Sequence, residues 1–265
     1  MIILAQTSDK QYEVKVTGQS ADVVTKCQQF QTWLDNFDHD KMELRMISIQ
    51  SADIADTFGG GKVIFVKMET EVYDRKTGKP IPGIVFLRGN AVAVLCLVVC
   101  KETQEIYTLL TIQPRVPLGR HDFMETVAGM LDKSDGLVGR TVAEIKEETS
   151  ITIDPDELQY LGKWAPSAGG CDEKLLSFLV VKELSQQKID EVLSKTHGLA
   201  AENETITIRM YTLNDFVEQI SKDDQVGDAK ILSTLALLML RDNSNAMLKM
   251  LEKNAKKSKI IIDQT

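Results

Sequence analysis

The sequence has no long apolar run and no sign of a secretory leader. Among its 265 residues, no uninterrupted apolar stretch approaches the roughly 18 residues that a membrane-spanning helix needs. The first residues, MIILAQTSDKQYEVKV, lack a basic segment followed by a long apolar core. We therefore expect a cytoplasmic protein with no membrane partner.

Cysteine is also scarce. The chain has four cysteines and no CxxC pair, and Cys96 and Cys100 lie inside the apolar run AVAVLCLVVC. Free cysteines in such runs behave as small buried apolar side chains. We expect reduced, buried thiols rather than disulfides.

Positive charge and aromatic side chains are both in short supply. Lys and Arg number 31 against 39 Asp and Glu, which gives a net charge of −8, and aromatic residues make up 6% of the chain. Nucleic-acid affinity comes mainly from basic side chains on phosphates, and single strands also need aromatic stacking platforms. We expect no nucleic-acid partner.

The apolar pattern predicts a mixed order of strands and helices. A helix is expected over residues 20–37, with Ser20 as its N-cap, because apolar positions recur at helical spacing. β-branched runs bounded by Gly, Pro and polar turns predict strands within 58–74, 76–87, 91–100, 105–112, 156–167, 175–184 and 205–213. Helices are expected over 213–222 and in 228–251. This order indicates an α/β or α+β sandwich.

The segment LVGRTVAEIKEETSI, residues 137–151, has two unlike helix faces. Val138, Val142 and Ile145 form an apolar face, and the other face carries three glutamates, Glu144, Glu147 and Glu148. Each like-charge pair on a helix costs about 0.2–0.5 kcal/mol. The small cost allows a solvated acidic face, whereas the geometry also suits a hard divalent cation such as Mg²⁺. The acidic turn alone does not choose between them.

Its context resembles the Nudix box. That pattern is G, five residues, E, seven residues, then R-E-U-x-E-E-x-G-U, where U is a bulky apolar residue. The positions in register are Gly129, Glu144, Ile145, Glu147, Glu148 and Ile151. The resemblance implies a Nudix α/β/α sandwich with a mixed sheet, preceded by an amino-terminal helix-plus-strand region.

Three positions depart from the box. Asp135 stands in place of the first Glu, Ala143 in place of the Arg that pairs with box carboxylates, and Ser150 in place of the Gly that ends the helix. A left-handed helix end suits Gly best. Arg140, three residues before Ala143, is a candidate substitute for the missing cation.

Stretches outside the box are similar to one branch of the family, the ADP-ribose and ADP-sugar diphosphatases. They are FMETVAGML, WAPSAGGCDEK and THGLAAENETITI. A longer set, QTWLDNF, DRKTGKPIPGIVFLRGNAVAVL and LLTIQPRVPLGR, is similar to the plant ADP-sugar diphosphatases. The resemblance runs from about residue 30 to about residue 240, whereas the box alone leaves the substrate open.

The resemblance assigns roles residue by residue. It places metal binding on the carbonyl of Ala128 and on Glu144, Glu147, Glu148 and Glu204. Glu202 matches the proposed general base, and we count Glu147 with it as catalytic. Arg115, Glu125 and Arg88 are expected on the substrate side. Without the resemblance, Glu202 and Glu204 would be interpreted as a solvated loop, and Arg115 and Glu125 as a structural ion pair.

The implied reaction is hydrolysis of an ADP-sugar to AMP and a sugar phosphate. Mg²⁺ is the expected cofactor, with Mn²⁺ as an alternative. Residues 1–84 are expected to form a homodimer and to contact the adenine, and residues 85–265 to form the hydrolase domain with carboxyl-terminal helices. Two other functions stay open: a catalytically weak protein that senses nucleotide sugars, motivated by Ala143 and Ser150, and a Nudix hydrolase of another nucleoside diphosphate derivative.

Overall fold

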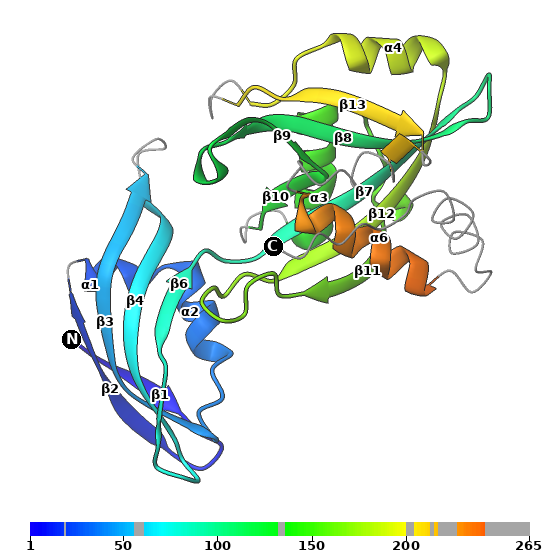
Figure 1. Ribbon diagram of the computed structural model, residues 1–265. Helices are drawn as coiled ribbons and strands as arrows, with labels where there is room; N and C mark the ends of the chain where they lie inside the picture. Colours follow the sequence, from blue (N-terminus) through cyan, green and yellow to red (C-terminus); the bar gives the residue numbers. More distant parts are fainter. Residues whose placement is uncertain are drawn as a thin grey trace, which may run out of the picture. The chain divides into compact units, whose positions relative to one another are not determined.

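Two compact units make up the protein. A computed structural model of the chain describes residues 1–18, 20–55, 61–131, 136–199, 204–212, 215–216 and 227–241. The first unit comprises Met1–Asn90 and Ala165–Lys174, and the second comprises Ala91–Trp164 and Leu175–Thr265. Each unit contains its own β-sheet (Figure 1).

The first unit is built on a six-stranded sheet. Its strands are β1 (Ile2–Gln6), β2 (Gln11–Gly18), β3 (Met42–Ala55), β4 (Lys62–Asp74), β5 (Pro80–Ile81) and β6 (Ile84–Leu87). The order is β1-β2-β3-β4-β5, and β6 also pairs with β4. Only β2 and β3 run parallel among the pairs within the described residues. Strands β3 and β4 are long neighbours in Figure 1.

Two short helices replace the single helix expected over residues 20–37. They are α1 (Ala21–Val24) and α2 (Gln28–Asp35). Ser20 is the N-cap residue of α1, as expected, but its φ is 59° and its side chain makes no capping hydrogen bond. A capping side chain needs extended backbone at the cap, and the left-handed conformation of Ser20 does not provide it. Val24 and Phe30 are nonetheless fully buried against the sheet, as the apolar spacing predicted.

Residues 165–174 return to the first unit and lie along β6. The amide of Phe86 donates to the carbonyl of Gly170 at 2.7 Å, and the amides of Arg88 and Gly89 donate to the carboxylate of Asp172 at 2.7 and 3.1 Å. This return gives the SAGGCDE stretch a defined place beside a strand.

The second unit contains a seven-stranded mixed sheet. Its strands are β7 (Ala91–Cys100), β8 (Ile106–Arg115), β9 (Arg120–Glu125), β10 (Val127–Met130), β11 (Gln159–Trp164), β12 (Leu175–Leu184) and β13 (Thr207–Thr212). The order is β11-β12-β7-β8-β13, with β10 paired to β7 and β9 to β8. Strands β7 and β12 run parallel, and the other pairs are antiparallel.

Helices cover both faces of this sheet. They are α3 (Gly136–Thr149), α4 (Gln186–Ser194) and α6 (Ala229–Arg241), with short 3₁₀ turns η1 (Val116–Leu118) and η2 (Pro155–Glu157). Successive side chains of a strand point to opposite faces. Val94 and Cys96 of β7 accordingly pack with α3 and α4, whereas Leu95 and Leu97 pack with α6. The expected α/β/α sandwich with a mixed sheet is confirmed.

Most of the elements expected from the pattern are present. The strand expectations correspond to β4 to β8 and β11 to β13, and α3 and α6 lie where helices were expected. Strands β1 to β3, β9 and β10 and helix α4 were not marked by the pattern. Val138 was expected on the apolar face of α3 but is 41% exposed, whereas the preceding residue, Leu137, packs against the core. Most of the helix expected over 213–222, and residues 242–251, lie outside the described residues.

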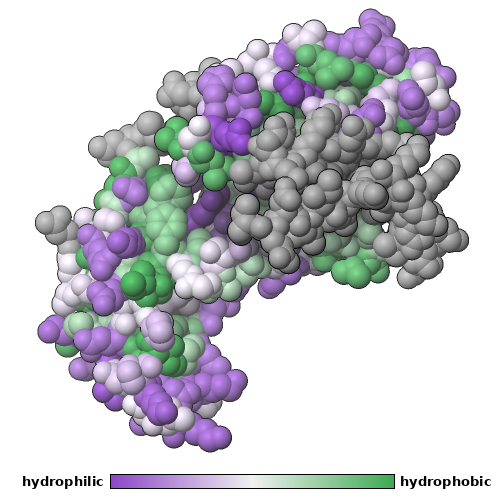
Figure 2. All heavy atoms as spheres, viewed as in Figure 1, coloured by the Kyte–Doolittle hydropathy of each residue, from purple (hydrophilic) through white to green (hydrophobic). Residues whose placement is uncertain are grey.

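The described residues bear on the expectations about membranes, disulfides and binding partners. Within the described residues, no helix has the length and apolar character needed to cross a membrane. Cys96 and Cys100 are buried, Cys27 and Cys171 are half-buried, and all four are free thiols. Figure 2 shows hydrophobic patches among hydrophilic residues over the strands of the first unit, whose exposed apolar side chains include Ile84 and Phe86 of β6. The cytoplasmic location and the lack of a nucleic-acid partner stay predictions.

Candidate active site

Helix α3 turns two of its glutamates away from water. Glu144 and Glu148 are one helical turn apart and therefore share a face, and they are 6% and 4% exposed. Helix α3 packs against β10 and β7. A fully solvated acidic face is thus wrong for these two residues, whereas the side chain of Glu147 stays 25% exposed.

Strand β10 offers these carboxylates a position without a side chain and a backbone hydrogen-bond donor. A Cβ atom on Gly129 would lie 1.7 Å from Oε1 of Glu144, so any side chain there would displace the carboxylate. The neighbouring amide of Ala128 donates to Oε2 of Glu148 at 3.3 Å. The glycine of the box therefore gives the carboxylate of Glu144 room against the strand.

Both buried carboxyls resist ionisation. Burial raises the pKa of Glu144 to about 7, with Arg140 opposing the rise and Glu147 and Glu204 adding to it. Burial also raises the pKa of Glu148 well above its ordinary value, helped by Glu144 and opposed by the Ala128 amide. Negative charge at this site exceeds the positive charge that the described side chains supply.

Arg140 supplies positive charge next to these carboxyl groups. Its Nη2 lies 2.5 Å from Oε1 of Glu144, and its Nη1 lies 3.6 Å from Oε2 of Glu147. The side chain is 22% exposed. Arg140 thus forms the ion pairs with box carboxylates that Ala143 cannot form.

Ser150 ends helix α3 in the conformation that Gly usually provides. Its φ is 56°, and its amide donates to the carbonyl of Lys146 at 2.9 Å. Its Oγ lies 3.1 Å from Nδ1 of buried His197, whose Nε2 lies 2.9 Å from the carbonyl of Val192. A carbonyl only accepts, so Nε2 carries the proton, and in the neutral ring Nδ1 accepts from the Ser150 hydroxyl.

The segment after His197 brings Glu204 to the same end of α3. The amide of Gly198 donates to the main-chain carbonyl of Glu147 at 3.2 Å, and the amide of Leu199 donates to Oε2 of Glu204 at 3.3 Å. Glu204 is close enough to raise the pKa of both Glu144 and Glu148. Glu202, the expected general base, and Asp135 lie outside the described residues.

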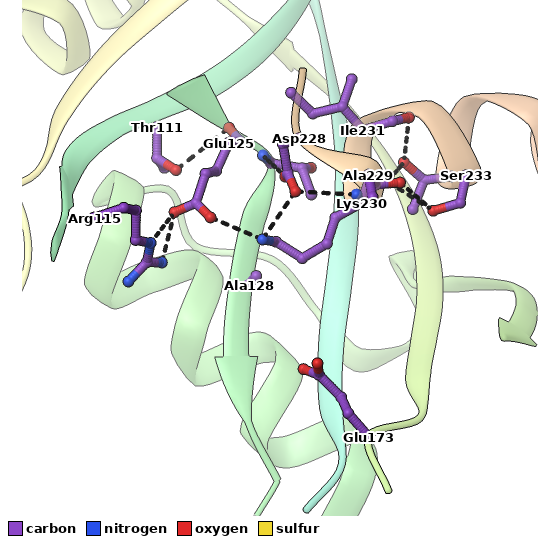
Figure 3. Close-up of polar contacts among 12 residues, drawn as sticks. Thr111, Arg115, Glu125, Ala128, Glu173, Asp228, Ala229, Lys230, Ile231 and Ser233 are labelled. Carbon is purple, nitrogen blue, oxygen red and sulfur yellow. Dashed lines mark hydrogen bonds and ion pairs between the residues drawn. The ribbon is translucent and has the colours of Figure 1, made fainter. Parts of the chain in front are cut away.

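Arg115 and Glu125 form a direct ion pair that extends to helix α6 (Figure 3). Nε and Nη2 of Arg115 lie 2.6 and 2.5 Å from Oε2 of Glu125, and Nζ of Lys230 lies 2.8 Å from the other oxygen. Glu125 also contributes to the raised pKa of Glu148. The ion pair therefore lies within electrostatic reach of the acidic helix.

Arg88 belongs to the first unit. Its Nε lies 3.2 Å from Oε1 of Glu173, and its main-chain amide is held by Asp172. Its assignment to the substrate stays a prediction.

The donor set fits a hard divalent cation. Mg²⁺ prefers oxygen ligands, and buried carboxylates with raised pKa values gain most from an added positive charge. Among the described residues, no three His, Cys, Asp or Glu side chains form a complete ligand group. Glu144 is instead paired with Arg140. A cation would therefore compete with Arg140 for this carboxylate.

Sequence reasoning missed three residues of this region. Lys230 and Asp228 lie more than one hundred positions after Glu125 and Thr126, which they contact, and His197 lies 47 positions after Ser150. No local pattern links such pairs. The stretch THGLAAENETITI did include His197, but its buried hydrogen bonds were not foreseen.

Comparison with known proteins gives one strong match. The chain is 32% identical to Nudix hydrolase 14, chloroplastic, of Arabidopsis thaliana over 225 residues, which cover 78% of this chain and 69% of that protein. No family model matches the chain. A solved structure described as an ADP compounds hydrolase aligns over 77% of this chain and 98% of its own, at 12% identity and a TM-score of 0.49. A structural likeness of that size supports no conclusion.

Proposed function

This chain belongs to the Nudix hydrolase family, and on that premise we propose that it cleaves the diphosphate of ADP-sugars, such as ADP-ribose and ADP-glucose, in a Mg²⁺-dependent reaction. The products are AMP and a sugar phosphate. Hydrolysis of a nucleoside diphosphate derivative follows from the family, whereas the ADP-sugar and Mg²⁺ are the proposal.

One observation supports the proposal above the others. Glu144 and Glu148 are buried side by side on one face of α3, opposite a strand whose Gly129 leaves room for a carboxylate. Burying two carboxyls without matching positive charge costs free energy. Such an arrangement is typical of a site that stabilises itself by binding a cation.

The residues that would hold Mg²⁺ are the carbonyl of Ala128 and the side chains of Glu144, Glu147, Glu148 and Glu204, with Mn²⁺ as the alternative ion. When bound, the cation would screen the diphosphate charges and stabilise the leaving phosphate. Ala128, Glu144 and Glu148 are supported by their contacts across α3 and β10.

Proton transfer is assigned to two carboxylates. Glu202 is proposed as the general base that takes the proton of the attacking water, with Glu147 as the second catalytic residue. A base must lie within hydrogen-bond reach of the proton that it accepts. The side chain of Glu147 is partly exposed and therefore accessible from solvent.

The substrate side is assigned to Arg115, Glu125 and Arg88. Arg115 is 39% exposed, so its guanidinium remains accessible to an anion although it is paired with Glu125. Guanidinium groups bind phosphates through several parallel hydrogen bonds. The preference for ADP-sugars rests on the sequence stretches QPRVP, SAGGCDE and HGLAAENE.

The first test is a substrate panel. ADP-ribose, ADP-glucose, UDP-glucose and coenzyme A are incubated with the protein and Mg²⁺, and AMP and the other products are quantified. We expect AMP from an ADP-sugar, and a loss of at least about a hundredfold in kcat in both Glu148→Gln and Glu202→Gln. Glu183→Gln, on an exposed carboxylate of β12, is the matched control and should retain full activity.

The same experiment separates the two alternatives. Turnover of UDP-glucose or coenzyme A alone would replace the ADP-sugar with another substrate. Metal-dependent binding of ADP-ribose without turnover of any compound would instead favour the sensor that Ala143 and Ser150 suggest.

A further inference from the structure

Glu125 lies between two cations that come from different elements (Figure 3). One carboxylate oxygen binds Arg115 of β8 through Nε and Nη2, and the other binds Nζ of Lys230 at 2.8 Å. Glu125 is 4% exposed. Both oxygens of a buried carboxylate are thus engaged, and the orientation of each cation depends on the other.

Lys230 is held in turn by Asp228. Its Nζ lies 3.1 Å from Oδ1 of Asp228, while Oδ2 of Asp228 accepts the amide of Thr126 at 3.4 Å. Asp228 also accepts the amide of Lys230 at 3.1 Å, just ahead of α6. The start of α6 is therefore fixed to the residue between β9 and β10, two positions before Ala128.

The network balances its own charge. Two cations face two carboxylates, and the side chains of Lys230, Glu125 and Asp228 are 17%, 5% and 6% exposed. The attraction of the two carboxylates outweighs burial and raises the pKa of Lys230. Lys230 therefore stays charged, and its removal would leave Glu125 with Arg115 alone and Asp228 with no cation among its described contacts.

We propose that Lys230, with Asp228, is a positioning residue that fixes the Glu125–Arg115 pair and so presents the guanidinium of Arg115 to the diphosphate of the substrate. This inference rests on the proposed function, because it takes Arg115 to contact the substrate. One edge of the guanidinium is bound to Glu125, which sets its plane, and the side chain remains 39% exposed. A group already held in its binding orientation loses less entropy when the ligand arrives.

The test is the variant Lys230→Met, which keeps the length and apolar stem of the side chain but removes its charge. We expect KM for the ADP-sugar to rise about tenfold, a coupling of about 1.4 kcal/mol, with kcat changed less than about threefold. Lys230→Arg, which keeps the charge, should recover most of the affinity. Lys188→Met, on a lysine of α4 that pairs with Glu191, is the matched control and should leave KM unchanged.

A double-mutant cycle distinguishes positioning from general damage. If Lys230 acts through Arg115, the change Lys230→Met should have almost no further effect on KM in an Arg115→Gln background. Full additivity of the two changes would overturn the inference. An unchanged KM in both single variants, with turnover still lost in Glu148→Gln, would overturn it while leaving the proposed function intact.

Folding is controlled with a neutralised variant. Lys230→Met combined with Asp228→Asn removes one charge of each sign and should recover most of the thermal stability lost in Lys230→Met, while KM stays raised. If both the thermal stability and KM of the double variant returned to the values of the unaltered protein, Lys230 would have only a structural role.

A binding measurement covers the case in which no ADP-sugar is turned over. Calorimetry with α,β-methylene-ADP, whose bridge is not hydrolysed at that position, should give about tenfold weaker binding to Lys230→Met than to the unaltered protein. Equal binding to both, or no binding to either, would contradict the inference irrespective of turnover.

Discussion

Glu144 and Glu148 make the stability of the metal-free protein depend on pH. Both carboxyls have raised pKa values because they are buried, Glu144 to about 7 from an ordinary value of 4.5. Between these pH values the folded protein retains protons that the unfolded chain releases. The stabilisation is complete below pH 4.5 and is lost as the pH rises through the folded pKa values.

The variant Glu148→Gln tests this dependence. A neutral amide can accept the same hydrogen bond from Ala128 without the cost of a buried charge, so the metal-free variant should be more stable than the unaltered protein at pH 8, by about 1–3 kcal/mol. At pH 4.5 the difference should nearly vanish. Thermal unfolding in EDTA at both pH values measures it.

The magnesium response supplies the control for that comparison. Added Mg²⁺ should raise the unfolding temperature of the unaltered protein and should do so much less in Glu148→Gln. Parallel pH profiles for the two proteins in EDTA would show that the ionisation of Glu148 costs nothing.

At this scale the sequence predicted acidic positions but not their partners. The spacing of Glu144, Glu147 and Glu148 allowed a cation site, but only the resemblance of its context to the Nudix box favoured that site over a solvated acidic face. That Arg140 reaches two of these carboxylates was only a hypothesis from spacing, and the structure bears out the contact. Lys230 could not be found, because only folding brings it to Glu125.

The end of helix α3 shows how one element is joined to another. Ser150 adopts the left-handed conformation and uses its hydroxyl to bind His197. The amide of His197 in turn donates to the carbonyl of Ile206 at 2.7 Å, and the amide of Ile206 donates to the carbonyl of His197 at 3.0 Å. The departure from Gly therefore connects α3 to the segment that carries Glu204.

Two substitutions separate the strain at Ser150 from its hydrogen bond. Ser150→Ala removes the bond and keeps the left-handed strain, whereas Ser150→Gly removes both. The strain costs about 1–2 kcal/mol, so the Gly variant should be about 1 kcal/mol more stable than the Ala variant. Urea unfolding at equilibrium compares the three proteins.

The free energy of unfolding of the unaltered protein should exceed that of Ser150→Ala by about 1–3 kcal/mol, because in this variant Nδ1 of buried His197 loses its hydrogen-bond partner. Equal stability of the Ala and Gly variants would mean that the left-handed conformation of residue 150 stores no strain.

Elements were predicted best where the pattern was longest. The apolar runs of β7 and β8 and the helical spacing of α3 identified their elements directly. The break between α1 and α2 was not visible, because the apolar positions on either side keep helical spacing through Thr25 and Cys27. Helix α4 was missed because its nine residues are mostly polar, with Ile189 and Val192 as its buried residues.

At the scale of the whole molecule, we predict a homodimer. Ile84 is 65% exposed and Phe86 is 38% exposed on β6, and the ring of Phe86 lies against that of Phe65 at 5.3 Å. Exposed apolar side chains that lie close together favour association with another chain. Light scattering should give twice the chain mass of 29.6 kDa.

A charge on this surface should weaken the association. Ile84→Lys is expected to shift the equilibrium towards monomer, whereas Val181→Lys, at an exposed position of β12, should not. A stable monomer of the unaltered protein at micromolar concentration would rule out the dimer.

The layered architecture of the second unit could be predicted from strand and helix order, but the division of the chain could not. The resemblance alone predicts a boundary near residue 84. The contacts divide the chain at Asn90 and return residues 165–174 to the first unit. A ten-residue loop of ordinary composition gives no sign that it belongs with strands eighty positions earlier.

That return means that the backbone passes between the units three times, after Asn90, after Trp164 and after Lys174. Neither unit is therefore a single stretch of coding sequence. A gene fragment ending at residue 90 would encode β6 without the segment that binds Phe86 and Arg88. A cut at any one of these junctions would therefore separate a unit from part of its own chain.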